Sequence, residues 1–341
     1  MQTRRLQGTS VTTTALGLGC ATLFHLPRPA DRRAILRVAL DSGIRHFDVA
    51  PMYGLGLAES ELGQVIRRHR EEVTITTKFG IDTTALGRLA GRLQRPVRAA
   101  LDRLPQVSGG VKSSGRGPGS GLVGRLLYSS EPYEPAAVRR SLDRSLLALS
   151  TDHIDLFMVH DPTSELLKDS SELAGYLATE VERGRIGTWG AATDVNTPNG
   201  QVRELNRISP VLQIRDDIFE GPPSSRTRAD QGLVTFGIME RVLPVLAANV
   251  AQSAVERSLW SERFGFDVGA PGALPALLIR QALSRNRSGP VLYGSTRPDR
   301  VAEAAKQAAS EQTPESMARE GDLLHELATA LHNREQGPEG P

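Results

Sequence analysis

Residues 73–78 read Val-Thr-Ile-Thr-Thr-Lys, a short run rich in β-branched residues that ends in a lysine. A charged segment, 67–72, precedes the run and Gly80 follows it, a pattern that predicts a β-strand. The chain uses arginine for most of its positive charge and has lysine at only four positions, 78, 112, 168 and 306. Because a lysine amine, unlike a guanidinium, can release its proton, Lys78 at the end of a strand indicates a chemical role.

Two other predicted strands also end in ionisable residues. The run 43–48 ends in Asp48, with Tyr53 five positions further on, and the run 154–160 ends in His160. Parallel strands that alternate with helices bring their C-terminal ends to one face, where polar groups meet at a ligand site. The sequence therefore predicts a site that combines these side chains with Lys78.

Helix and strand signals alternate along the chain. The predicted strands are 15–19, 44–48, 73–78, 154–160, 186–191, 210–215, 233–236 and 290–293. The predicted helices are 31–42, 57–70, 135–149, 170–183, 199–207 and one that starts near 298. This alternation predicts an α/β fold, a closed (β/α)8 TIM barrel. The competing architecture is an open doubly wound sheet, but Gly17-Leu18-Gly19 is not followed by the third glycine of a G-x-G-x-x-G turn.

We expect one domain, residues 1–335, with a frayed tail at 336–341. A long insertion, 80–133, follows the third predicted strand. Its centre, 108–121, is rich in glycine and serine and has the composition of a flexible loop. This loop could act as a lid over the site or be a disordered insertion.

The composition excludes several classes of protein. The 341 residues are 39% hydrophobic and 23% charged with a net charge of +2, basic and acidic residues are mixed, and aromatic residues are only 4%, so we expect no nucleic-acid partner. Cys20 is the single cysteine, and no Cys/His cluster has the spacing of a metal site. No export signal or apolar run of ~20 residues is present, so we expect a cytoplasmic protein with no membrane segment.

Over about residues 10–310 the chain resembles the aldo-keto reductase superfamily. The resemblance rests on five motifs: His-Phe-Asp-Val-Ala-Pro-Met-Tyr-Gly at 46–54, Glu-Ser-Glu-Leu-Gly at 59–63, Thr-Thr-Lys at 76–78, Asp-His-Ile-Asp-Leu at 152–156 and Val-His-Asp-Pro at 159–162. The insertion and the phrase Tyr133-Glu134-Pro135 are most similar to the bacterial aldose-dehydrogenase-like branch. The resemblance implies an NADP-dependent oxidoreductase that acts on a small carbonyl or hydroxyl compound.

The resemblance implies a catalytic tetrad of Asp48, Tyr53, Lys78 and His160, and the chemistry asks for these residue types. Reduction of a carbonyl by hydride needs a proton donor, and a tyrosine with a pKa near ~10 donates reluctantly unless a cation lies close to it. Lys78 would be that cation, Asp48 would hold the ammonium, and His160 would orient the carbonyl oxygen.

The cofactor site is expected between the eighth strand and the helix after it. Small residues and arginines at a helix N-terminus suit a phosphate group. By resemblance this segment binds the adenosine phosphate through Gly294, Ser295, Thr296, Arg297 and Arg300. Ser295 and Arg300 would hold a 2′-phosphate, which favours NADPH over NADH. Glu303 would face the adenosine and Gln213 the nicotinamide amide.

Three departures from the family pattern keep alternatives open. Ala192-Thr193 replaces a Ser-Asn pair, 235–239 lacks a Tyr-Ser-Pro pattern, and Ala304 replaces an asparagine. We predict an NADPH-dependent reductase of small aldehydes or ketones. The alternatives are an NAD(P)-dependent aldose or alcohol dehydrogenase that works in the oxidative direction, a non-redox or regulatory barrel that binds cofactor weakly, and a barrel that transfers protons without a cofactor.

Overall fold

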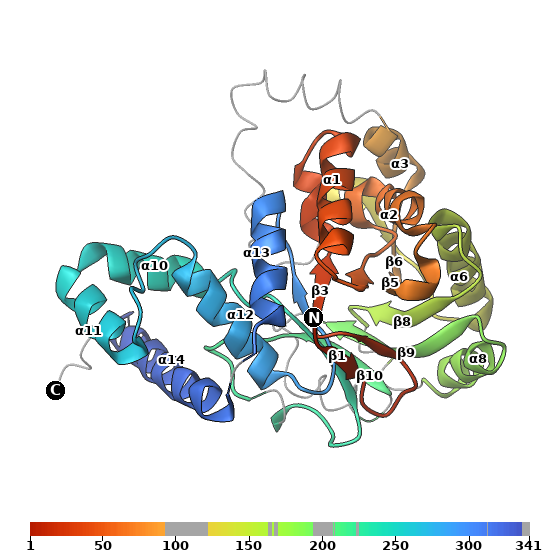
Figure 1. Ribbon diagram of the computed structural model, residues 1–341. Coiled ribbons are helices and arrows are strands. Elements are labelled where there is room, and N and C mark those ends of the chain that lie inside the picture. Colours follow the sequence, from red (N-terminus) through yellow and green to blue (C-terminus); the bar gives the residue numbers. More distant parts are fainter. Residues whose placement is uncertain are drawn as a thin grey trace.

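The computed structural model describes residues 1–92, 122–162, 166, 170–193, 207, 209–222, 225–311 and 313–335. Eight parallel strands close into a barrel, each hydrogen-bonded to the next (Figure 1). In order around the barrel they are β3 (Leu16–Gly19), β4 (His46–Asp48), β5 (Thr74–Phe79), β8 (Ile154–His160), β9 (Ile186–Thr193), β10 (Val211–Arg215), β11 (Gly232–Phe236) and β12 (Val291–Tyr293). The predicted TIM barrel is confirmed, and every strand lies within two residues of its expected bounds.

Helices between the strands cover the outside of the barrel. They include α1 (Pro29–Asp41), α2 (Ala58–Ile66), α6 (Pro135–Leu149), α8 (Ser171–Glu182) and α13 (Pro298–Ala309). Helix α1 begins two residues before the expected Asp31, because Pro29 occupies its first turn. Helix α2 ends at Ile66, earlier than expected, and a short 3-10 helix follows at Arg70–Glu72. Of the expected helix 199–207, only Arg207 lies within the described residues.

A second group of helices, which the sequence analysis did not assign, lies between β11 and β12 and at the C-terminus. It consists of α10 (Val242–Gln252), α11 (Ala254–Phe264), α12 (Ala273–Arg285) and α14 (Pro314–Glu335). In Figure 1, α10, α11 and α14 lie together on the side away from α2, α6 and α8. They pack around their own buried cluster, which includes Leu246, Leu277 and Leu324. This group extends the fold beyond the eight-fold repeat.

Two smaller sheets lie outside the barrel. At the N-terminus, β1 (Thr3–Arg5) pairs with β2 (Thr12–Thr14). The turn between them covers the bottom of the barrel, because Gln7 N–H donates to the carbonyl of Ser288 and Leu6 packs beside Gly232. In the insertion, β6 (Ile81–Thr83) pairs with β7 (Tyr128–Ser130), flanked by α3 (Ala85–Arg92) and α5 (Leu122–Leu127). The Gly/Ser-rich segment 108–121 and the tail 336–341 lie outside the described residues.

The alternation of side chains along the strands decides what faces the inside of the barrel. Successive residues of a strand point to opposite faces. On β4 the inner residues are therefore His46 and Asp48, and on β5 they include Thr74 and Lys78; the contact of His46 Nδ1 with Thr74 Oγ1 at 2.9 Å is consistent with this. The outer residue Phe47 is buried in the apolar layer beneath the helices. Strands β4 and β5 thus present polar side chains to the inside of the barrel.

Glu59 is a carboxyl group buried in this apolar layer. It lies on α2, is 6% exposed, and accepts a hydrogen bond of 2.7 Å from Thr77 Oγ1. Burial raises the pKa of Glu59 to about 7, because desolvation disfavours the charged form. The native state therefore binds this proton more tightly than the unfolded chain does. Its stability should fall as the pH rises from about 4.5 towards 7.

The variant Glu59→Gln tests this linkage. It keeps the shape and cannot ionise, so it should be more stable than the wild-type protein above pH 7, by up to roughly 3 kcal/mol, and the difference should shrink below pH 5. Denaturant unfolding at pH 5 and pH 8 measures both values. The exposed Glu71 supplies the control, since Glu71→Gln removes a surface charge. Equal effects of the two substitutions would contradict the assignment.

Candidate active site

A cavity of about 680 Å³ opens at the C-terminal ends of the barrel strands. The four residues of the predicted tetrad, Asp48, Tyr53, Lys78 and His160, all line it. Asp48 ends β4, Lys78 lies next to the end of β5, and His160 ends β8, while Tyr53 begins the 3-10 helix η2 (Tyr53–Leu55). The structure therefore brings together side chains that are 112 positions apart in the chain at their extremes.

Lys78 and Asp48 form a buried ion pair. Lys78 Nζ donates to Asp48 Oδ1 at 2.6 Å and to the carbonyl of Val49 at 3.2 Å, and the two side chains are only 2% and 4% exposed. Burial by itself would lower the pKa of Lys78, but Asp48 and Tyr53 raise it above its ordinary value. Lys78 is therefore held as an ammonium ion at neutral pH.

Gln213 completes the surroundings of the Asp48 carboxylate. Its Nε2 donates to Asp48 Oδ2 at 3.0 Å, so each carboxylate oxygen accepts one side-chain hydrogen bond. Burial raises the pKa of Asp48, and the hydrogen bonds from Lys78 and Gln213 oppose that rise by favouring the ionised form. This places Gln213, on β10, in direct contact with the pair from the other side of the barrel.

Tyr53 and His160 face each other at the mouth of the barrel. Their ring centroids are 6.1 Å apart with an edge-on angle of 87°, and Lys78 Nζ lies 5.2 Å from the Tyr53 ring centroid. Burial raises the pKa of Tyr53, while the charge of Lys78 and a hydrogen bond with it act in the opposite direction. Burial, together with Lys78, lowers the pKa of His160 to about 3, so this imidazole is neutral. A neutral ring can donate a hydrogen bond from one nitrogen and accept with the other.

The turn that carries Tyr53 depends on Gly54. Gly54 has φ +61, a left-handed conformation that L side chains rarely adopt. A Cβ atom on Gly54 would lie 2.0 Å from the ring of Phe24, which itself packs under the guanidinium of Arg32 at 4.8 Å. Glycine thus lets the chain pass close to the Phe24 ring directly after Tyr53.

Three buried polar atoms of the cavity have no hydrogen-bond partner within the described part of the chain. They are Gln213 Oε1, His160 Nδ1 and Thr22 Oγ1. A buried polar atom without a partner is costly, so such atoms in a cavity indicate the positions where a polar ligand binds. A nicotinamide carboxamide and a carbonyl substrate offer suitable donors and acceptors, and the residues present fit both groups.

The expected phosphate segment divides into two sets. Gly294, Ser295 and Arg300 line the cavity. Thr296, Arg297 and Glu303 are not among its lining residues; Arg297 pairs with Asp299 at 2.6 Å, and Glu303 accepts from Gln307 at 2.8 Å.

Ala192 and Thr193, at the position of the family's Ser-Asn pair, also line the cavity. Both are buried, at 4% and 5% exposed. The departure from the family pattern therefore lies at the wall of the site and not at a distance from it.

Thr22, Arg215 and Glu240 also line the cavity, although none of the sequence motifs points to them. Arg215 carried a usable signal, because it ends a predicted strand in an ionisable residue as Asp48 and Lys78 do. Thr22, in the 3-10 helix η1 (Ala21–His25), and Glu240, in a turn, carried no such signal.

Among the residues that the structure describes, no group of three or more His, Cys, Asp or Glu side chains could hold a metal ion. Within the same residues, no helix is long and apolar enough to cross a bilayer.

Comparisons with known proteins give the class of protein to which this barrel belongs. The chain belongs to the aldo/keto reductase family, whose family model matches residues 15–214. The chain is 28% identical over 331 residues to the D-threo-aldose 1-dehydrogenase of a Pseudomonas species, covering 87% of this chain and 90% of that protein. It is 40% identical over 161 residues to the pyridoxal 4-dehydrogenase of Microbacterium luteolum, 46% of this chain but only 42% of that protein.

Solved structures show the same fold. An aldo-keto reductase from Bacillus halodurans superposes with a TM-score of 0.65 at 19% identity, covering 95% of this chain and 96% of that one. The resemblance to the superfamily and to its aldose-dehydrogenase-like branch, predicted from the motifs, is confirmed.

The role of Gly54 can be measured against a second glycine. Gly54→Ala should lower the free energy of unfolding by roughly 2–4 kcal/mol, because it combines left-handed backbone strain with a clash against Phe24. Gly184 is the matched control: it has φ +71 and no atom within 4 Å of the point that a Cβ would occupy, so Gly184→Ala should cost only roughly 1–2 kcal/mol. Denaturant unfolding compares them, and equal losses would show that Phe24 does not constrain this turn.

Proposed function

We propose that this protein is an NADPH-dependent oxidoreductase that reduces a small aldehyde or ketone to an alcohol, with Tyr53 as the general acid. The observation that carries the proposal is the buried Lys78–Asp48 pair beside Tyr53, with His160 across the mouth of the cavity. A purely structural barrel has no need for a buried ammonium beside a tyrosine, because burying two charges is costly.

Each residue of the tetrad has a distinct part in the proposed reaction. When bound, the reduced nicotinamide would supply the hydride. Tyr53 gives its hydroxyl proton to the carbonyl oxygen, and the Lys78 ammonium stabilises the tyrosinate that remains. Asp48 keeps Lys78 charged and in place. His160, neutral and edge-on to Tyr53, donates a hydrogen bond that orients the carbonyl.

The preference for NADPH rests on the end of the cavity next to α13. Ser295 and Arg300 line the cavity there, and a hydroxyl with a guanidinium suits a 2′-phosphate, which NADH lacks. At the other end, Gln213 Oε1 is available to accept a hydrogen bond from the nicotinamide amide.

The oxidative direction is the second candidate. Two relatives are named as dehydrogenases, D-threo-aldose 1-dehydrogenase and pyridoxal 4-dehydrogenase. The same groups serve both directions, since a Tyr53 that donates a proton in reduction accepts one in oxidation. A hydroxylated substrate such as an aldose would then be oxidised with NADP or NAD. A non-redox barrel remains the third candidate, and dinucleotide binding separates it from the first two.

Removal of the proposed acid gives the sharpest test of the chemistry. Tyr53→Phe should lower the rate of carbonyl reduction by about 10²–10⁴-fold while the dissociation constant for NADPH stays nearly unchanged, because the proton is needed only in the transition state. Steady-state kinetics and calorimetric titration measure the two quantities. Tyr128→Phe, in β7 outside the cavity lining, is the control. A Tyr53→Phe enzyme that kept its rate would show that another group is the acid.

Cofactor preference is tested by Arg300→Ala, with NADPH and NADH titrated side by side. The dissociation constant for NADPH should rise about tenfold or more and that for NADH should change little, because only NADPH carries the phosphate that Arg300 would bind. Arg287→Ala is the control, since Arg287 is exposed in the loop before β12, at the other end of the barrel. An equal effect on both dinucleotides would remove the basis for an NADPH preference.

A further inference from the structure

Arg215 is a charged side chain of the cavity to which the proposed reaction gives no role. It is the last residue of β10, two positions after Gln213, and both residues line the cavity. Its guanidinium lies over the Phe236 ring, 5.4 Å from the centroid, and its Nη1 donates to Glu240 Oε2 at 2.7 Å. The Arg215 side chain is 13% exposed, so this charge is largely withdrawn from solvent.

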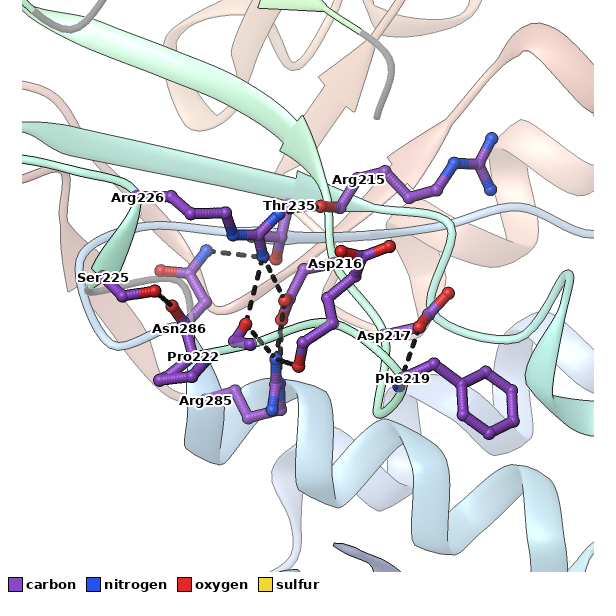
Figure 2. A network of polar contacts seen from close by, with 12 residues as sticks. Arg215, Asp216, Asp217, Phe219, Pro222, Ser225, Arg226, Thr235, Arg285 and Asn286 are labelled. Atoms are coloured by element: carbon purple, nitrogen blue, oxygen red, sulfur yellow. Dashed lines mark hydrogen bonds and ion pairs between the residues drawn. The ribbon is translucent and has the colours of Figure 1, made fainter. Parts of the chain in front are cut away.

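The backbone around Arg215 is held by a network of buried charges. Asp216 is 1% exposed and accepts hydrogen bonds from Arg226 at 2.7 Å and from two nitrogens of Arg285 at 2.8 and 3.0 Å (Figure 2). Arg226 also donates to the carbonyl of Arg215 at 3.1 Å. Asp217 is 3% exposed and accepts a hydrogen bond from Arg241, the residue directly before α10.

Within this network the carboxylates of Asp216 and Asp217 have arginines of their own, and Arg215 is turned elsewhere. Figure 2 shows its side chain extending away from the cluster of Asp216, Arg226 and Arg285. A charged side chain on a rigid element is pre-organised to bind a ligand, because little order has to be created on binding. The network thus presents the Arg215 guanidinium to the cavity from a fixed base.

Glu240 is a replaceable partner of Arg215. Glu240 is 56% exposed, and an ion pair with so exposed a carboxylate contributes little stability. An oxyanion of a bound ligand, screened from water in the cavity, would compete well for the same guanidinium. In this respect the Arg215–Glu240 pair differs from the buried pairs of Asp216.

Position in the barrel identifies the anion. The Arg215 guanidinium lies over the ring of Phe236, which ends β11. Strand β11 lies between β10, which carries Gln213, and β12, after which Ser295 and Arg300 line the same cavity. The guanidinium therefore lies between the proposed nicotinamide end and the proposed adenosine-phosphate end. The group between those two ends of a dinucleotide is the pyrophosphate. Resting on the proposed function, we propose that Arg215 binds the cofactor pyrophosphate, and that Glu240 occupies the guanidinium until the cofactor displaces it.

The two partners should respond with opposite signs. Arg215→Gln should raise the dissociation constants of NADPH and NADH by a similar factor, about tenfold or more, because both carry the pyrophosphate. Glu240→Gln should lower both, since the competing carboxylate is gone. Arg215→Lys, which keeps the charge, should recover part of the affinity. Arg228→Gln is the control, because Arg228 lies in the loop between β10 and β11, pairs with Asp230 and does not line the cavity. Calorimetric titration of the unloaded protein measures every value.

The outcomes separate this inference from the proposed function. A wild-type protein that binds neither dinucleotide would refute both. If Arg215→Gln bound NADPH as well as the wild-type protein does, the role of Arg215 alone would be refuted. The same role would be refuted if Glu240→Gln and Arg215→Gln each weakened binding, because a merely structural ion pair would behave in that way. A third result is that Arg215→Gln leaves dinucleotide binding unchanged and weakens the binding of glyceraldehyde 3-phosphate but not that of glyceraldehyde. That result would assign Arg215 to the substrate and overturn the pyrophosphate assignment.

Discussion

The buried ion pair between Lys78 and Asp48 is the interaction on which the site depends. Two charges inside a barrel are tolerated only when each satisfies the other, and loss of one partner typically costs about 3–5 kcal/mol. That requirement fixes the ends of β4 and β5 relative to each other through the 2.6 Å contact. It also recruits Gln213 from β10 across the barrel to the second carboxylate oxygen. The ammonium held in this way is what could make Tyr53 an effective acid.

A second set of buried charges holds the chain directly after β10, next to Arg215 of the cavity wall. Asp216 and Asp217, directly after β10, are neutralised by arginines from the loop, from α12 and from the start of α10. The extra helices between β11 and β12 therefore do more than enlarge the fold, because they supply two of these arginines, Arg285 and Arg241.

Much of this could be predicted from the sequence because it is encoded locally. Short apolar runs between helical segments predicted all eight strands, and the ionisable residues at strand ends predicted that Asp48, Lys78 and His160 share one cavity. The helices of the segment 242–285 were not predicted, and many of their buried apolar residues pack against one another and against α14. Within the expected phosphate segment, Arg297 pairs with Asp299, and Glu303 accepts a hydrogen bond from Gln307. Sequence spacing alone does not reveal these contacts.

The sequence by itself determined the barrel and the family, because the alternation of strands and helices and the short motifs can be read without knowledge of contacts. The same motifs predicted the four residues of the proposed tetrad. Only the tertiary structure decided that Gln213 reaches Asp48, that Thr22 and Arg215 share the cavity with the tetrad, and that Glu240 pairs with Arg215. The physical reason is distance along the chain: Gln213 and Asp48 are 165 positions apart, and only closure of the barrel brings such residues within hydrogen-bonding range.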